Sequence, residues 1–161
     1  MKTHYKIVLL GTLLIALSGC NTESPNLPVG YTLPPMPDAT ENSKTIAGID
    51  SNTNGVRDDV EIYIYSNYSK PEEQKALMQY ANAKQLLLAN VKTKEDVVVY
   101  SDAIDSAIQC EMKVFNNSIR SLKELDSQTI NTTSRVSQEH HIEKLMSKVV
   151  LEMNFKANPC E

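Results

Sequence analysis

The twelve residues from Asp50 to Glu61 carry oxygen-bearing side chains at fixed intervals. Asp, Asn, Asn, Asp and Glu occupy the first, third, fifth, ninth and twelfth positions, and Gly55 occupies the sixth. Carboxylate and amide oxygens are the ligands that Ca²⁺ prefers, and a glycine at the sixth position permits the sharp turn that wraps them round one ion. The pattern therefore predicts a calcium-binding loop at 50–61, and Ca²⁺ is the cofactor that it implies.

This spacing resembles the loop of an EF-hand. The resemblance implies that five side chains and one backbone carbonyl hold the ion, and the implied ligands are Asp50, Asn52, Asn54, Val56, Asp58 and Glu61. Val56 would contribute its carbonyl, Asp58 would bind directly or through water, and Glu61 would be bidentate. Because two of the early ligands are neutral amides, we expect a dissociation constant of about 10⁻⁵ to 10⁻³ M, which suits structural stabilisation.

The segment departs from a complete EF-hand in two ways. Residues 41–49 do not have the pattern of an entering helix, and the eighth loop position is Arg57, where an apolar residue usually pairs with a second loop. Both departures indicate a solitary loop followed by one helix. An alternative interpretation needs no ion, because Asn54 and Gly55 favour a tight turn and the following acids favour a helix start. That interpretation leaves the oxygens of Asp50 and Asn52 without a role.

The N-terminus has the order of features that a secretory signal requires. Lys2 and Lys6 give a positive region, and the apolar residues at 7–17 follow it. This run is too short to cross a bilayer as a permanent helix. The sequence therefore predicts export from the cytoplasm.

The apolar run ends in Leu17-Ser18-Gly19-Cys20, which resembles the lipobox of bacterial lipoproteins. The resemblance implies that 1–19 are a cleaved signal peptide and that the Cys20 thiol receives acyl chains such as palmitate, so that the lipid bilayer is a partner. Asn21 follows in place of the Asp associated with inner-membrane retention, which implies the outer membrane and its periplasmic face. The alternative is an ordinary cleaved signal with an incidental cysteine. The chain as a whole is similar to small, uncharacterised bacterial lipoproteins that carry such a loop ahead of a helical domain, and this resemblance implies no activity.

Residues 20–43 contain the predicted lipidated cysteine and five prolines among polar residues. Proline without a periodic apolar pattern favours an extended, semi-rigid segment. We therefore expect a tether that holds the domain away from the lipid. In the alternative arrangement this segment packs onto the domain through its larger apolar side chains, which are Val29, Tyr31, Leu33 and Met36.

Residues 44–161 are about the size of one domain. Apolar residues recur at helical spacing in four stretches, and we expect helices near 56–68, 71–90 and 93–122, and a last helix from about 131 that carries apolar residues to Met153 and is ended by Pro159 and Cys160. Asn116 and Asn117 are the positions at which the third helix could bend or break. The sequence thus predicts an all-α fold, a small bundle of about four helices preceded by the calcium loop and the Pro-rich tether.

Cysteine use and charge agree with export. Cys110 and Cys160 form an even pair in an oxidising compartment, which favours a disulfide over two free thiols. Removal of the signal takes away two lysines and leaves 14 basic against 20 acidic residues, a formal net charge of −6. This acidic balance excludes nucleic acid as an expected partner.

The sequence contains no motif typical of a reaction centre, and no catalytic residue is predicted. We therefore expect a non-enzymatic, calcium-stabilised, membrane-anchored periplasmic lipoprotein that acts by contact with an unknown protein partner. A more specific version is an immunity-type inhibitor that protects the envelope from a toxin. The alternative is a small-ligand-binding or enzymatic protein that uses a helical pocket lined by Tyr63, Tyr65 and Tyr68.

Overall fold

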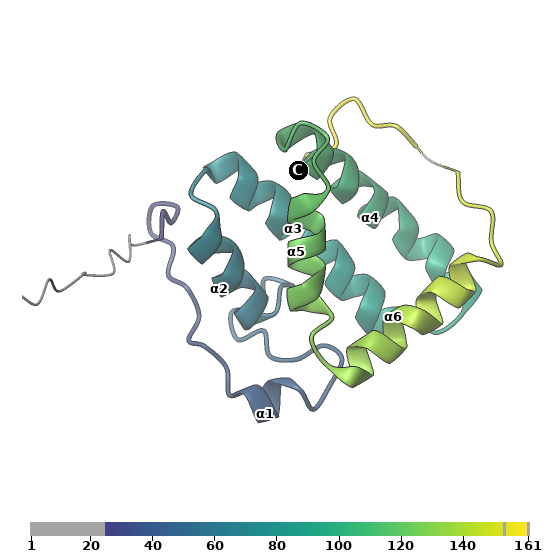
Figure 1. Ribbon diagram of the computed structural model, residues 1–161, viewed down its shortest axis with the longest axis horizontal. Coiled ribbons are helices and arrows are strands. Elements are labelled where there is room, and N and C mark those ends of the chain that lie inside the picture. The colour runs from purple at the N-terminus through teal and green to yellow at the C-terminus, as the bar shows by residue number, and fades with distance from the viewer. Residues whose placement is uncertain (1–24, 153, 161) are drawn as a thin grey trace, which may run out of the picture.

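The computed structural model describes residues 25–152 and 154–160, and every regular element in this part of the chain is a helix. The all-α prediction is therefore confirmed. The helices, drawn in Figure 1, are α1 Ala39–Asn42, α2 Asp58–Asn67, α3 Pro71–Asn90, α4 Lys94–Val114, α5 Arg120–Thr129 and α6 Thr133–Met146.

Helix α3 forms the centre of the domain. It packs along α4 and also contacts α2, α5 and α6. Ile64, Leu77 and Leu125 are fully buried where α2, α3 and α5 meet, and a second apolar cluster holds Val91 and Ile142 near the contact of α3 with α6. Burial of each such aliphatic side chain contributes about 1.5–3 kcal/mol.

Local signals define several helix starts. Thr93 and Asp96 form a reciprocal capping box at the start of α4, and the Thr132 hydroxyl accepts the Arg135 backbone N–H at the start of α6. Pro71 occupies the first turn of α3, where its missing N–H leaves no donor unpaired. These caps set the starting points of the long helices.

The predicted helix at 93–122 is interrupted at Asn116 and Asn117, so this stretch forms two helices, α4 and α5. Both asparagines have left-handed backbone angles, with φ of 52° and 63°. Asparagine tolerates this conformation better than most residues because its short polar side chain bonds locally. The Asn117 N–H donates to the Met112 carbonyl at 2.7 Å, which closes the last turn of α4. The reversal lets α5 return to α2 and α3.

The last helix ends at Met146, so the prediction that it continues to Pro159 is wrong. Val149 and Leu151 follow it and pack against the second apolar cluster outside any helix. The chain then returns to α4, where a disulfide joins Cys110 and Cys160, as the sequence predicts. This return places the C-terminal segment beside the end of α4.

The described part of the predicted tether lies along the domain. The Asn26 side chain donates to the Ser69 carbonyl at 2.7 Å, and the Tyr31 ring lies 5.2 Å from the Tyr65 ring. Pro34 is buried, whereas Val29 is exposed. The structure therefore has the packed arrangement over this stretch, with Tyr31 as its main aromatic contact. Within the described residues, no helix combines the length and apolar character needed to cross a membrane.

Candidate functional site

The predicted calcium loop is a tight turn held by its own side chains. The Asp50 carboxylate accepts the backbone N–H groups of Asn54 and Gly55 at 3.2 and 2.8 Å. The Asn54 side-chain oxygen accepts the Val56 N–H at 2.8 Å. Gly55 has a φ of +85°, and a Cβ there would lie 2.1 Å from the Asn82 amide nitrogen. Glycine is therefore required at the sixth position, as the sequence predicts.

Glu61, the last loop residue, is fully buried in the first turn of α2. Its carboxylate accepts hydrogen bonds from the Asn52 amide at 3.1 Å, from the Asn54 amide at 2.6 Å and from the Tyr31 hydroxyl. Burial and the bond to Glu61 raise the pKa of the Tyr31 hydroxyl, so it remains a donor. Three of the predicted ligands, Asn52, Asn54 and Glu61, are thus brought into contact.

The other predicted ligands face the loop backbone or the core. Asp58 is buried, and its Oδ1 accepts the Ser51 N–H at 2.9 Å, which ties the ninth position to the second. The Val56 side chain packs in the first apolar cluster. In the part of the chain that the structure describes, no three His, Cys, Asp or Glu side chains gather as a metal-binding group. Three of the six predicted calcium ligands, the Asn52 and Asn54 amides and the Val56 backbone carbonyl, do not belong to these four residue types.

The chemistry of the loop fits a hard cation. Among the described residues, no Lys, Arg or His forms an ion pair with Asp50, Asp58 or Glu61. A buried carboxylate without a positive partner is costly. The surrounding side-chain groups are carboxylates, amides and a hydroxyl, all of which carry oxygen. A divalent cation would supply the missing positive charge.

Arg57, at the eighth loop position, contacts a distant helix instead of a second loop. Its guanidinium is fully buried and pairs with Asp59, with Nη2 3.1 Å from Oδ2. It also donates to the carbonyls of Gln128 and Thr129 at 2.7 and 3.1 Å. These carbonyls end α5, where a positive charge is favourable. Sequence reasoning missed this role because the partners lie 71 and 72 residues away.

Arg135 forms a second buried contact beside Arg57. It donates to the carbonyls of Asn42 and Ile46 at 2.6 and 3.0 Å and to the Asn131 side-chain oxygen at 2.7 Å. Burial and the neighbouring Arg57 charge lower the pKa of Arg135. We call Arg57, Asp59, Asn131 and Arg135 the arginine clamp. It holds the segment before the loop against the α5–α6 turn.

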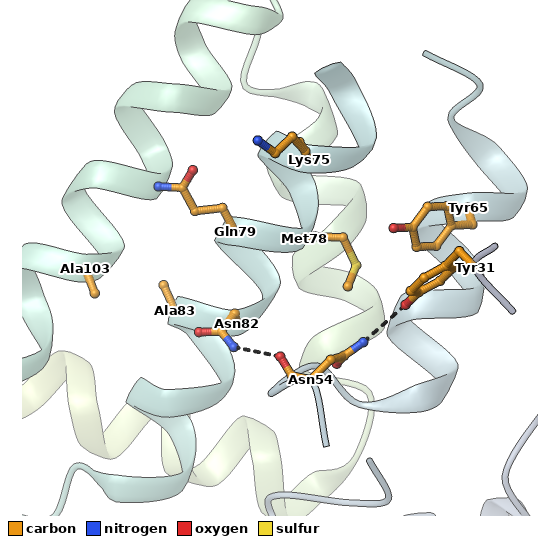
Figure 2. A pocket seen from close by; sticks show the side chains of 9 residues that line it. All are labelled: Tyr31, Asn54, Tyr65, Lys75, Met78, Gln79, Asn82, Ala83 and Ala103. Atoms are coloured by element: carbon orange, nitrogen blue, oxygen red, sulfur yellow. Dashed lines mark hydrogen bonds between the residues drawn. The ribbon is translucent and has the colours of Figure 1, made fainter. Parts of the chain in front are cut away.

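A pocket of about 410 Å³ adjoins the loop. Figure 2 shows Tyr31 and Tyr65 on one side, Ala83 and Ala103 on the other, and Met78 between them. Of the three tyrosines predicted to line a pocket, Tyr65 lines this one, and Tyr68 lines a different pocket together with Tyr65.

The other two predicted tyrosines pack elsewhere. Tyr68 contacts Phe115 edge-on, with ring centres 5.9 Å apart, and its hydroxyl donates to Glu124 at 3.2 Å. Tyr63 packs edge-on against Tyr68. Both therefore contribute to the apolar contacts between α2 and α5, and not to the pocket.

The predicted lipidation residue Cys20 and the signal at 1–19 lie outside the described residues. The disulfide pair Cys110 and Cys160 lies far from the loop along the chain and ties the C-terminal segment to α4. Comparison with models of protein families, with curated proteins and with solved structures gives no match to this chain.

Proposed function

We propose that this chain is a calcium-stabilised lipoprotein, anchored through acylated Cys20 at the periplasmic face of the outer membrane, that acts by protein contact without catalysis. The observation that carries the calcium proposal is Glu61, a fully buried carboxylate that accepts hydrogen bonds from the Asn52 and Asn54 amides and forms no ion pair with a cation among the described residues. Calcium in the loop would supply that charge.

The residues that would hold the ion are those implied by the loop spacing: Asp50, Asn52, Asn54, the Val56 carbonyl, Asp58 and Glu61. The Asn52 and Asn54 amide nitrogens donate to Glu61, and each amide would turn its oxygen, the atom that Ca²⁺ binds, toward the ion. Binding would join the start of the loop to the first turn of α2. The expected effect is therefore greater stability of the native state, since an ion that binds only the folded chain favours it.

Thermal unfolding in excess CaCl₂ and in EGTA tests the calcium proposal. We expect calcium to raise the melting temperature by about 5–10 °C when its concentration is a hundred times the dissociation constant. Asp50→Ala should abolish the increase. Glu143→Gln removes an exposed carboxylate on α6 and should keep it. An equal melting temperature in both buffers would contradict the proposal.

The lipid anchor is tested separately, by growing cells that express the protein with an alkyne-labelled palmitate. We expect the label on the wild-type protein, which should sediment with outer membranes. Cys20→Ser should lose both the label and the membrane association, whereas Cys110→Ser should keep them. A labelled or membrane-bound Cys20→Ser protein would contradict attachment at Cys20.

Protein contact is tested by affinity capture of the lipidated protein from envelope fractions. A specific partner should co-purify in stoichiometric amount with the wild type. A secreted toxin as that partner would identify the immunity-type inhibitor that we propose as the more specific version, and toxin activity should then fall on addition of the purified protein. If no protein is enriched over a capture with an unrelated lipoprotein, the contact role is contradicted.

A further inference from the structure

The pocket beside the loop has the size and walls of a small-molecule site. Its volume of about 410 Å³ falls in the range of roughly 300–1,000 Å³ that ligand pockets occupy. It is bounded by Tyr31 of the N-terminal segment, Asn54 of the loop, Tyr65 of α2, several residues of α3 and Ala103 of α4. Five separate parts of the chain therefore enclose one space.

One wall of the pocket is aromatic. The Tyr31 and Tyr65 rings are tilted at 36° with centres 5.2 Å apart. The Tyr31 hydroxyl donates a hydrogen bond to Glu61, and Tyr65 is only 8 % exposed, so both rings are held in place. A fixed aromatic wall of this kind favours a flat apolar group, which can pack on the rings in offset or edge-on geometry.

The opposite wall is shaped by small and adaptable side chains. Ala83 and Ala103 leave space because neither extends beyond Cβ, and Met78 lies between them and the tyrosines (Figure 2). Methionine fits ligands of different shape and makes favourable contacts with aromatic rings. Most of the lining is therefore suited to an apolar ring system.

Lys75 is the only charged residue among those that line the pocket. It lies at the upper edge of the space in Figure 2, on α3, and it is exposed. Among the described residues it forms no ion pair. A lone ammonium at the edge of an apolar pocket complements a ligand with one anionic group.

From these contacts we propose that the pocket binds a small aromatic molecule that carries a single anionic group, with the ring between Tyr65 and Ala103 and the anion at Lys75. The pocket shares Asn54 with the proposed calcium loop, and the proposal concerns the calcium-free chain. It adds a small ligand to the protein contact proposed above.

Two fluorescent probes that differ in one group test the proposal. Anilinonaphthalene sulfonate has the rings and an anion, whereas N-phenylnaphthylamine has the same rings without it. Titrations of the full chain in EGTA keep the result separate from the calcium proposal. We expect saturable binding of one sulfonate probe per chain. Absence of saturable binding would overturn the proposal.

Two variants with matched controls locate the site. Lys75→Met should weaken binding of the sulfonate probe about two- to fivefold and leave the neutral probe unchanged. Ala103→Leu fills the exposed edge of the pocket and should weaken both probes. Lys144→Met and Ala89→Leu make the same changes at exposed positions on α6 and α3 and should change neither.

The outcomes separate the two parts of the proposal. Unchanged binding of both probes to Ala103→Leu would overturn the pocket as the site. If Lys75→Met weakens binding of the sulfonate probe and of the neutral probe to the same extent, the proposal that Lys75 binds the anionic group is overturned. Far-ultraviolet circular dichroism of each variant checks that its helices are intact. If Ala103→Leu unfolds, Met78→Leu replaces it as the variant that alters the pocket lining.

Discussion

At the scale of single residues, the arginine clamp explains why Gly48 is a glycine. Its φ is +68°, and a Cβ there would lie 2.2 Å from Arg57 Cδ and 2.7 Å from Arg135 Nη2. Both guanidiniums pass against the bare backbone at this point. Gly48 therefore permits the clamp because it has no side chain to occupy the space of the two arginines.

Gly48→Ala should lower the free energy of unfolding by about 2–4 kcal/mol, because it adds a left-handed Cβ and a steric clash with Arg57. Gly30→Ala is the matched control, since Gly30 also has a positive φ, of +79°, but nothing within 4 Å of its Cβ position. We expect about 1 kcal/mol there. Urea unfolding measures both, and equal losses would show that the clamp tolerates a side chain at 48.

Asp59 gives the clamp a dependence on pH. Burial raises the pKa of this carboxyl, but the hydrogen bonds and charge of Arg57 outweigh it, so the pKa lies below the ordinary 3.8. A carboxyl with a lowered folded pKa stabilises the protein above its unfolded pKa, and this stability is lost as the pH falls through the folded value.

Asp59→Asn should therefore reduce the dependence of the melting temperature on pH below about 4. The measurement is a series of thermal melts between neutral pH and pH 2, for the wild type and the variant. Glu143→Gln removes an exposed carboxylate on α6 and should leave the curve close to that of the wild type. A parallel curve for Asp59→Asn would contradict a lowered pKa.

At the scale of elements, local patterns predicted helix starts better than helix ends. The capping box of Thr93 and the start of α3 at Pro71 are encoded within one turn. Asn116 and Asn117 were predicted as the point of a break. The early end of α6 at Met146 was not, because Val149 and Leu151 continue an apolar pattern but pack outside a helix, in a segment that must return to Cys110.

Replacement of Asn116 and Asn117 by alanine tests the break between α4 and α5. Alanine disfavours the left-handed conformation, so the double alanine variant should lose about 1–2 kcal/mol of unfolding free energy. The double glycine variant accepts these angles and should stay within about 0.5 kcal/mol of the wild type. Chemical denaturation compares them, and an alanine variant as stable as the glycine variant would contradict a strained reversal.

At the scale of the whole molecule, composition and periodicity were sufficient for the all-α fold and for the disulfide. They were not sufficient for the arginine clamp, whose partners meet only after folding, since Arg57 contacts carbonyls more than seventy residues away. The alternative expectation was a pocket lined by Tyr63, Tyr65 and Tyr68, whereas the pocket beside the loop is lined by Tyr65 and by Tyr31 of the N-terminal segment. Periodicity within α2 cannot indicate a partner outside that helix.

The disulfide closes a loop with a sequence separation of 50 and should contribute about 4 kcal/mol to stability. The double variant Cys110→Ser and Cys160→Ser should lose that amount in urea unfolding and retain its helical circular dichroism. Dithiothreitol should lower the wild type to the stability of the variant and leave the variant unchanged. A reductant effect on the variant would show that the loss has another origin.

The contact of Asn26 with Ser69 and Gln74 also sets how far the domain can stand from a lipid bilayer. If Cys20 carries the acyl chains as proposed, five residues lie between it and Asn26, the first described residue that is hydrogen-bonded to the domain. At about 3.6 Å per extended residue, the segment from Cys20 to Asn26 spans at most about 20 Å, whereas a free tether from Cys20 to residue 43 would span about 80 Å. With the proposed anchor, the face of the domain around Asn26 would therefore stay close to the lipid headgroups.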